Sequence, residues 1–403
     1  MKKLKTILKN SAILMAGLFL TTCVEEFEPE TITFESALVV EATITDEVKT
    51  QEIYLSRTFA FEEDGPESET SATVGVTDDQ GSSFAFVESE PGIYRSVAEF
   101  GAITGRDYTL NITTSDGRGY SSSAMELPPT TELDSIYAER IVDSNGVDGI
   151  AIYADSFDQT NSSNNYRYTY EETFRIIAPR WKPDDLAPDD SQLVGPCAVK
   201  LVPKESEEQT CYRTDFSTDI IQFQTNDLEE DRISRFLIRF ISNQDYIISH
   251  RYTIQVRQLI QSDQSYAFYE TLNEFSSIES LFSSTQPGFL NGNVSSDTNG
   301  NEKVLGYFDV ATVDEKRLFF NYEDFYPGEP LPPYVNPCMP SAPVIANEGG
   351  CVLRVQVEAN IIRYLDLNQD PPLNEGPYLV VPRVCGDCTE IGSIEVPEFW
   401  TEE

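Results

Sequence analysis

The sequence has a single histidine, His250, among its 403 residues. A histidine zinc site and histidine-based acid–base chemistry would both depend on this one ring, which we expect to be an ordinary surface residue. The chain also lacks a Gly-x-Ser-x-Gly elbow and a Gly-x-x-x-x-Gly-Lys loop, the usual signals of a serine hydrolase and of a nucleotide-binding protein. No carboxylate pair stands out among the 68 acidic residues. We therefore predict no catalytic residue, no metal site and no cofactor.

Basic residues are scarce: 28 Lys and Arg face 68 Asp and Glu, which gives a formal net charge of −40. Such a field repels nucleic acid and anionic lipid, so neither is expected as a ligand. Disorder would also explain strong acidity, but 40% hydrophobic residues with 20 Tyr and 23 Phe indicate a packed core. At this length the chain is expected to form two domains rather than one.

A long apolar run is also missing. The longest candidate, Ile13–Leu20, is far shorter than the ~20 residues that a membrane-spanning helix needs. It follows a start that carries four lysines and no acidic residue, which is typical of a secretory signal peptide over residues 1–22. Its removal would bring the net charge to −40 − 4 = −44.

Cys23 follows this segment directly, and the stretch Leu20–Cys23 resembles a bacterial lipobox. Thr22 departs from the Gly, Ala or Ser that normally precedes the cysteine of that motif. We predict that Cys23 is lipidated and that residues 23–36 form the anchor and an acidic tether. The acidic pair Glu25 and Glu26 resembles the surface-export signal of lipoproteins in bacteria with starch-utilisation-type uptake systems. The alternatives are ordinary secretion with a spare thiol at Cys23, and a plain acidic linker.

The seven cysteines support this interpretation, because assigning Cys23 to lipid leaves an even number in an exported chain. The disulfide candidates are Cys197, Cys211, Cys338, Cys351, Cys385 and Cys388. Cys197 with Cys211, and Cys338 with Cys351, would close short loops worth ~3 kcal/mol each in the chain-entropy model. Cys385 and Cys388 could bridge internally, chelate a metal, or pair with Cys338 and Cys351. Structural disulfides are favoured over a zinc site, which needs reduced thiols, and over a redox motif, which needs a βαβ context.

Short alternating segments separated by polar turns predict a mainly β protein. Residues 37–126 are expected to form an N-terminal β-sandwich of the transthyretin or carboxypeptidase-regulatory type, which Ala72–Val76 and Tyr108–Ile112 resemble. The prolines at 128 and 129 place a linker at residues 127–134. Residues 135–403 would form a larger β-rich domain with an irregular insertion at 178–210 and a disulfide-stapled tail from Pro327 onward.

One short helix is predicted at residues 263–276. Ser262 suits its N-cap, and Tyr266, Tyr269, Leu272 and Phe275 recur at helical spacing. Two polar stretches have oxygen side chains at alternating positions, as a calcium loop would: Asp297–Glu302 and Asp143–Gly146. The glycine of Asp297–Glu302 stands at the fourth place rather than the sixth, and no helix pair flanks that stretch. Both stretches are interpreted as polar turns.

Several of these features together resemble the family of domain of unknown function 4249. They are the lipobox, the strand Ala37–Thr45, the segments Leu133–Tyr137 and Val304–Phe308, and the ending Cys385-Gly-Asp-Cys388 to Phe399-Trp400. The resemblance implies an outer-membrane lipoprotein often encoded beside a TonB-dependent receptor. It implies no activity and no functional residue.

We therefore expect a lipid-anchored protein on the outer surface of the outer membrane. It would act as a non-catalytic accessory or binding subunit of a TonB-dependent nutrient uptake system, with the receptor as its partner. One alternative is a stand-alone carbohydrate- or peptide-binding lipoprotein that uses exposed aromatics such as Trp181. The other is a secreted hydrolase based on carboxylates.

Overall fold

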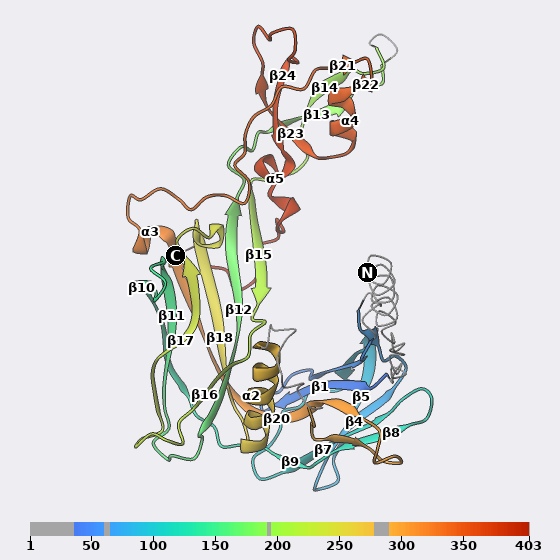
Figure 1. Ribbon diagram of the computed structural model, residues 1–403, viewed down its shortest axis with the longest axis vertical. Helices are drawn as coiled ribbons and strands as arrows, with labels where there is room; N and C mark the ends of the chain where they lie inside the picture. The colour runs from blue at the N-terminus through green and yellow to red at the C-terminus, as the bar shows by residue number, and fades with distance from the viewer. Residues whose placement is uncertain (1–35, 60–64, 192–194, 278–289, 403) are drawn as a thin grey trace, which may run out of the picture. The chain divides into compact units, whose positions relative to one another are not determined.

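The computed structural model describes residues 36–59, 65–191, 195–277 and 290–402 (Figure 1). The chain divides into one unit of residues 1–36 and 59–65 and a second of residues 37–58 and 66–403. Every element described below belongs to the second unit. The predicted mainly β fold is confirmed.

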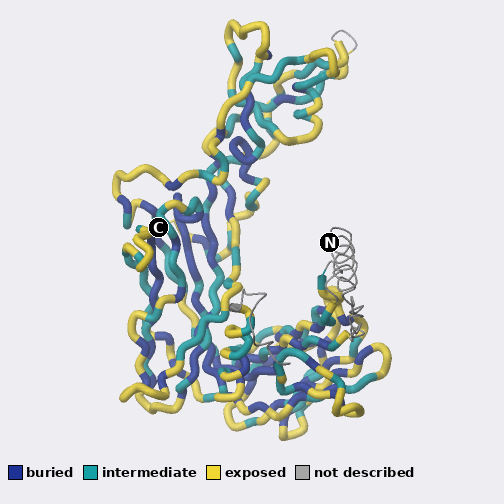
Figure 2. Tube along the Cα trace, viewed as in Figure 1, coloured by how far each residue is buried: buried dark blue, intermediate teal, exposed yellow. Residues whose placement is uncertain are grey.

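The first strands alternate between the core and the surface, as half-buried strands do. In β1 (Leu38–Thr45), Leu38, Val40, Ala42 and Ile44 are buried. The strands that follow are β2 (Glu52–Arg57), β3 (Glu67–Ser68), β4 (Thr73–Asp78), β5 (Ser83–Glu90), β6 (Ile93–Ser96), β7 (Asp107–Thr113), β8 (Gly119–Ser122) and β9 (Met125–Glu126). Their buried faces share one hydrophobic cluster. Figure 2 shows buried residues along the strands and exposed ones at the turns.

The rest of the chain adds longer strands and short helices. The strands are β10 (Leu133–Val142), β11 (Asp148–Phe157), β12 (Asn165–Ile177), β13 (Asp184–Pro188), β14 (Val199–Pro203), β15 (Thr210–Phe216), β16 (Ile221–Gln224), β17 (Arg232–Ser242), β18 (Arg251–Ile260), β19 (Val294–Ser296), β20 (Val304–Asn321), β21 (Ala346–Asn347), β22 (Gly350–Cys351), β23 (Ile362–Leu367) and β24 (Tyr378–Pro382). The helical elements are η1 (Tyr246–Ile248), α2 (Asp263–Ser277), α3 (Tyr322–Phe325), α4 (Val352–Glu358), α5 (Arg383–Gly386) and η2 (Cys388–Glu390).

Strand β20 connects two groups of strands in the largest sheet, β1 to β8 on one side and β12, β15 and β18 on the other. Its first part pairs in parallel with β1, from Leu38 opposite Val304 to Thr45 opposite Ala311. Its second part pairs antiparallel with β18 over residues 312–321. The sheet order is therefore β15-β12-β18-β20-β1-β2-β6-β5-β4-β7-β8-β19. The first hydrophobic cluster accordingly includes Phe268 of α2 and four residues of β20, which are Val304, Tyr307, Phe308 and Val310. The predicted domain boundaries at residues 127–134 stay a prediction.

A second hydrophobic cluster lies between two groups of strands. One is the separate sheet β10-β11-β17, and the other is formed by β12, β18 and the second part of β20. Tyr168 of β12 packs on Phe236 of β17 with ring centroids 5.3 Å apart. Tyr166, Tyr168, Phe174 and Ile176 of β12 are buried in this cluster.

The insertion, which was expected to be irregular, and the tail both contain regular structure. Residues 184–203 form the hairpin β13–β14, and the tail forms the hairpin β23–β24 with α4 and α5. Leu186 of β13, Leu353 of α4 and Val380 of β24 share a small buried cluster. The two segments therefore pack on each other, although Leu186 and Leu353 are 167 residues apart in the sequence.

Candidate functional site

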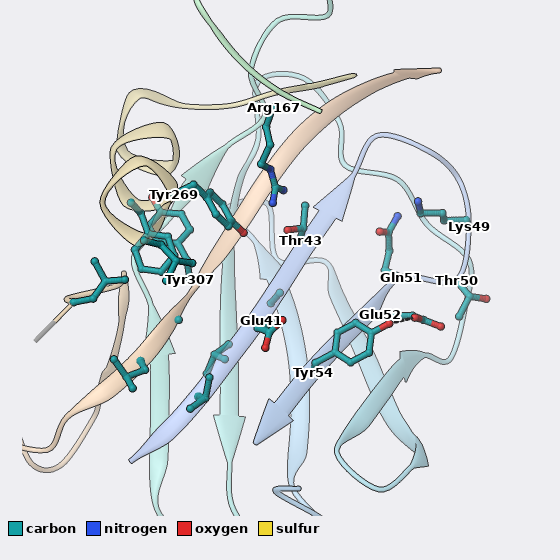
Figure 3. Close-up of a pocket in the computed structure, with 18 residues that line it drawn as sticks. Glu41, Thr43, Lys49, Thr50, Gln51, Glu52, Tyr54, Arg167, Tyr269 and Tyr307 are labelled. Carbon is teal, nitrogen blue, oxygen red and sulfur yellow. Dashed lines mark hydrogen bonds between the residues drawn. The ribbon is translucent and has the colours of Figure 1, made fainter. Parts of the chain in front are cut away.

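A cavity with a volume of about 750 Å³ lies beside the junction of β1 and β20. Its floor comes from β1, the start of β2 and the first part of β20, and helix α2 and Arg167 of β12 complete its wall (Figure 3). A volume of this size falls within the range of ~300–1,000 Å³ that is usual for small-molecule sites. We therefore take it as the candidate functional site.

The floor of the cavity is the face of β1 that points away from the core. Because side chains alternate along a strand, Val39, Glu41 and Thr43 lie on this face while Val40 and Ala42 enter the first cluster. In the pairing register Glu41 lies opposite Tyr54 of β2 on one side and Tyr307 of β20 on the other. The floor thus carries an exposed carboxylate between two phenol rings.

Helix α2 covers one end of this floor. Its predicted N-cap is confirmed, since the Ser262 hydroxyl accepts a hydrogen bond of 3.1 Å from the amide of Ser265. Tyr269 and Leu272 pack against the first cluster as the apolar stripe predicts. Phe268, which that stripe did not include, is buried and stacks on Tyr307 with ring centroids 4.8 Å apart. This end of the cavity is apolar, and Leu290, Leu305 and Val39 complete it.

Arg167 supplies a cation in the wall. Its side chain is 13% exposed, and its guanidinium lies 4.1 Å from the centre of the Tyr269 ring, a cation–π contact. Figure 3 shows the guanidinium pointing to the side of Thr43. Its ion pair with the fully buried Asp309 is long, with 3.8 Å between Nη2 and Oδ2. Asp309 is held instead by Gln261, whose Nε2 donates to Oδ2 at 3.0 Å.

The other end of the cavity is polar. Glu52 accepts a hydrogen bond of 2.6 Å from the Tyr54 hydroxyl and another of 2.6 Å from Arg95. These two bonds lower the pKa of Glu52. The bond to Glu52, together with burial, raises the pKa of Tyr54 to about 12. Lys49 is paired with Glu47 at 2.6 Å, and Gln51 bonds to backbone carbonyls of the neighbouring loops.

The lining groups of the cavity are of the kind that bind a ligand. Glu52 is held in its ionised form by Tyr54 and Arg95, which is the reverse of what a general acid requires. Within the ranges that the structure describes, no group of three or more His, Cys, Asp or Glu side chains is arranged to hold a metal ion. An apolar end with a few polar groups at the other end is the usual composition of a ligand pocket.

The six cysteines beyond Cys23 all form disulfides, but the expected partners were wrong for four of them. The bonds join Cys197 to Cys351, Cys211 to Cys388 and Cys338 to Cys385. The short-loop pairs Cys197–Cys211 and Cys338–Cys351 do not form because tertiary packing sets the partners. The hairpin β13–β14 lies on α4, which brings the Cα atoms of Cys197 and Cys351 to 4.9 Å. The pairing of Cys385 with Cys338 was one of the options that the sequence left open.

The Cys385-Gly-Asp-Cys388 motif has a structural role in this fold. Asp387 is 1% exposed and accepts hydrogen bonds from Arg363, from Arg383 at 2.9 Å and from Thr389. Although burial opposes ionisation, these bonds lower its pKa to about 2. The ending is also anchored: Trp400 is buried and packs edge-on against Tyr212 at 4.8 Å.

The other predicted features occupy ordinary structural positions. Trp181 is partly buried against the second cluster, so it is not the exposed aromatic that the carbohydrate- or peptide-binding alternative requires. His250 is also partly buried rather than an ordinary surface residue, and burial together with Arg175 lowers its pKa to about 4.

Both calcium-like stretches are polar turns, as interpreted. The Asp143 carboxylate accepts backbone bonds from Asn145 and Val147. In the second stretch Asp297 accepts a bond from Ser121, and Glu302 accepts bonds from Arg118 and Tyr120. Their oxygens therefore already have partners from within the chain.

Cys23, Glu25 and Glu26 lie outside the described residues, and their predicted roles stay predictions. Among the residues that are described, no helix is long and apolar enough to cross a membrane.

The sequence analysis did not predict the cavity. Arg167, Tyr269 and Glu41 belong to segments far apart in the chain, and each has an ordinary strand or helix pattern around it. The one available hint was Glu41, a charged residue at the centre of a strand of branched residues.

Comparison with known proteins gives one family match. The model of the family described as Domain of unknown function (DUF4249) matches residues 24–317. The match ends before the Cys385 to Trp400 ending on which the resemblance partly rested. No curated protein matches the chain.

Among solved structures, a DUF4785 family protein from Legionella pneumophila is similar at 9% identity, over 55% of this chain and 51% of that one, with a TM-score of 0.17. The chain thus spans about half the length of that protein.

Proposed function

Because the chain belongs to the DUF4249 family, whose description names no activity, we propose a function from the chain's own chemistry. We propose that it is a lipid-anchored protein on the surface of the outer membrane. There it serves as a non-catalytic accessory or binding subunit of a TonB-dependent nutrient uptake system. The cavity beside β1, β20 and α2 would be its ligand site.

The pattern of disulfide-bonded cysteines is the main support for this proposal. Three disulfides take up six cysteines and leave Cys23, which follows the signal-like segment directly. Three structural disulfides fit an oxidising compartment outside the cytoplasm. In such a compartment a single remaining cysteine at a lipobox-like site fits lipidation better than a free thiol.

Two features of the cavity favour a binding role. The cavity combines an apolar end with a polar one, and the carboxylate of Glu52 within it is held ionised, which argues against that residue as a general acid. The TonB-dependent receptor as partner rests on the family resemblance.

Metabolic labelling with a radioactive fatty acid tests the anchor. We expect label on the parent chain and none on Cys23→Ala. The matched control is Thr22→Gly, which restores the usual lipobox residue and should label at least as well as the parent. Unlabelled parent protein, or label retained in Cys23→Ala, would contradict the anchor.

Affinity purification from outer membranes in mild detergent tests the partner. We expect a large β-barrel receptor to co-purify with the parent and to be lost with Cys23→Ala, which is no longer held at the membrane. Recovery of the chain alone as a monomer would overturn the accessory role and favour the stand-alone binding alternative. Protease treatment of intact cells should remove the protein if it faces outward.

A further inference from the structure

We infer that the cavity beside β1, β20 and α2 binds an amphipathic small molecule, whose apolar body lies under α2 and whose single anionic head group is held by Arg167. This inference deepens the proposed function and rests on it for the biological use of the site. It adds the chemical class of the ligand.

The apolar end accounts for the body of the ligand. Phe268, Leu272 and Leu290 close it from the side of α2, and Val39, Leu305 and Tyr307 form its floor. The stacked pair of Phe268 and Tyr307 is buried, at 8% and 4% exposure, so the rings are fixed before any ligand arrives. Burying an apolar surface on a preformed wall is favourable because it removes that surface from water. This end therefore suits an aliphatic or aromatic body.

Arg167 accounts for the head group. Within the described residues its guanidinium donates no hydrogen bond, and its Nε is buried without a partner. Its ion pair with Asp309 measures 3.8 Å, whereas other partly buried arginines form close contacts: Arg239 lies 3.2 Å from Glu172, and Arg383 lies 2.9 Å from Asp387. With 68 acidic residues against 28 basic ones, an arginine with unused donors in a cavity wall is notable. A planar guanidinium matches a carboxylate, sulfonate or phosphate oxygen pair.

The position of Arg167 is fixed, which favours binding. The ring of Tyr269 supports the guanidinium at 4.1 Å, and the helix that carries Tyr269 is capped by Ser262. A cation held in place loses little side-chain entropy when it binds an anion. The head group would lie beside Thr43, toward which Arg167 points (Figure 3).

Glu41 limits the charge of the ligand. It is exposed on the same face of β1 as Thr43 and two residues away, at roughly 6.7 Å along the strand. Its carboxylate, together with Glu52 at the polar end, would repel a second negative group. The ligand class is therefore one with one anionic group, and with neutral or donor groups where it faces Glu41.

Two fluorescent dyes with the same aromatic body test the inference. Anilinonaphthalene sulfonate carries one anionic group, and phenylnaphthylamine is its uncharged counterpart. Both are titrated into the full chain carrying Cys23→Ala, so that neither an acyl chain nor detergent competes for the dye. We expect saturable binding of both dyes to this parent.

The charge is tested by the double variant Arg167→Gln with Asp309→Asn, which removes both members of the buried pair and leaves no lone carboxylate. We expect its Kd for the sulfonate dye to be about ten-fold weaker or more, and its Kd for the uncharged dye to change by less than about two-fold. Arg232→Gln is the matched control, because Arg232 is 48% exposed and packs on Phe157 outside the cavity. Arg232→Gln should leave the Kd of both dyes unchanged.

The location of the binding site is tested by Leu272→Trp. This substitution fills the apolar end of the cavity and should weaken the binding of both dyes. Circular dichroism and thermal unfolding check that every variant folds. The inference is overturned if the parent binds neither dye, if the double variant binds both as the parent does, or if Leu272→Trp affects neither. This assay uses no membrane or receptor, so a negative dye result would not contradict the proposed anchor or partner. In the same way, negative labelling or co-purification results would not contradict the inferred ligand class.

Discussion

Asp387 shows how a single buried carboxylate can hold the C-terminal segment together. Its side chain is 1% exposed and lies between two arginines, Arg363 and Arg383, in the turn that also contains Cys385 and Cys388. We expect Asp387→Asn to lower the free energy of unfolding by about 3 kcal/mol at neutral pH, because both arginines lose a buried counter-ion. Urea unfolding measures this change.

The control for Asp387 is Asp215→Asn. Asp215 pairs with Arg213 at 2.8 Å, but its side chain is 36% exposed, so its loss should cost less than about 1 kcal/mol. Equal losses for the two variants would contradict the importance of burial at Asp387.

The same carboxylate gives the stability a pH dependence. The pKa of Asp387 is lowered from 3.8 to about 2, so its folded-state pKa lies below its unfolded value. Its contribution, roughly 2 kcal/mol, is complete above the unfolded pKa and is lost as the pH falls through the folded one. The difference in the free energy of unfolding between the parent and Asp387→Asn should therefore be constant from pH 7 to about 5 and should decrease below about pH 4. If this difference stays the same down to about pH 2.5, the destabilisation comes from lost packing and not from lost charge.

At the scale of elements, the junction of β1 and β20 depends on Gly306. Its φ is +96°, and a Cβ there would lie 1.8 Å from the carbonyl oxygen of Val40, its partner in the register. We expect Gly306→Ala to lower the free energy of unfolding by about 3 kcal/mol or more, since the overlap adds to the cost of the left-handed conformation.

Gly117→Ala separates the two costs. The φ of Gly117 is +86°, but a Cβ there would meet nothing within 4 Å. We therefore expect Gly117→Ala to lower the free energy of unfolding by only about 1 kcal/mol, the conformational cost. Chemical unfolding of both variants makes the comparison. If both lose the same stability, the close approach of β1 to β20 is not what Gly306 permits.

Individual elements could be predicted from the sequence more fully than their partners. The strand expected at 37–45 is β1 (38–45), and the helix expected at 263–276 is α2 (263–277), because alternation, helical spacing and an N-cap are local signals. The parallel pairing of β1 with β20 was not predictable, because a strand pattern shows which face is buried and not which strand lies beside it. The candidate site depends on that pairing, since it is what brings Glu41 beside Tyr307.

At the scale of the whole molecule, long-range connections offset the repulsion of an acidic surface. A formal charge of −40 destabilises a compact state through self-repulsion. Two of the disulfides span 154 and 177 residues, and closing a loop of that size stabilises by on the order of 5 kcal/mol in the chain-entropy model. Cys211–Cys388, the packing of Trp400 on Tyr212 and the bond from Arg175 to Glu402 all fasten the C-terminal ending to the strands β12 and β15.

The disulfide pattern gives a count that tests the fold and the anchor together. We expect mature protein, denatured without reductant and alkylated, to show no free thiol by mass spectrometry, and six after reduction, because six cysteines are in disulfides and Cys23 carries lipid. Unprocessed precursor should show one free thiol and then seven, whereas Cys23→Ala should show none and then six. Non-reducing peptide maps should contain the three linked pairs of the structure. Pairs with other partners would contradict the fold. One free thiol in the mature protein would contradict lipidation while leaving the fold intact, because Cys23 lies outside all three bonds.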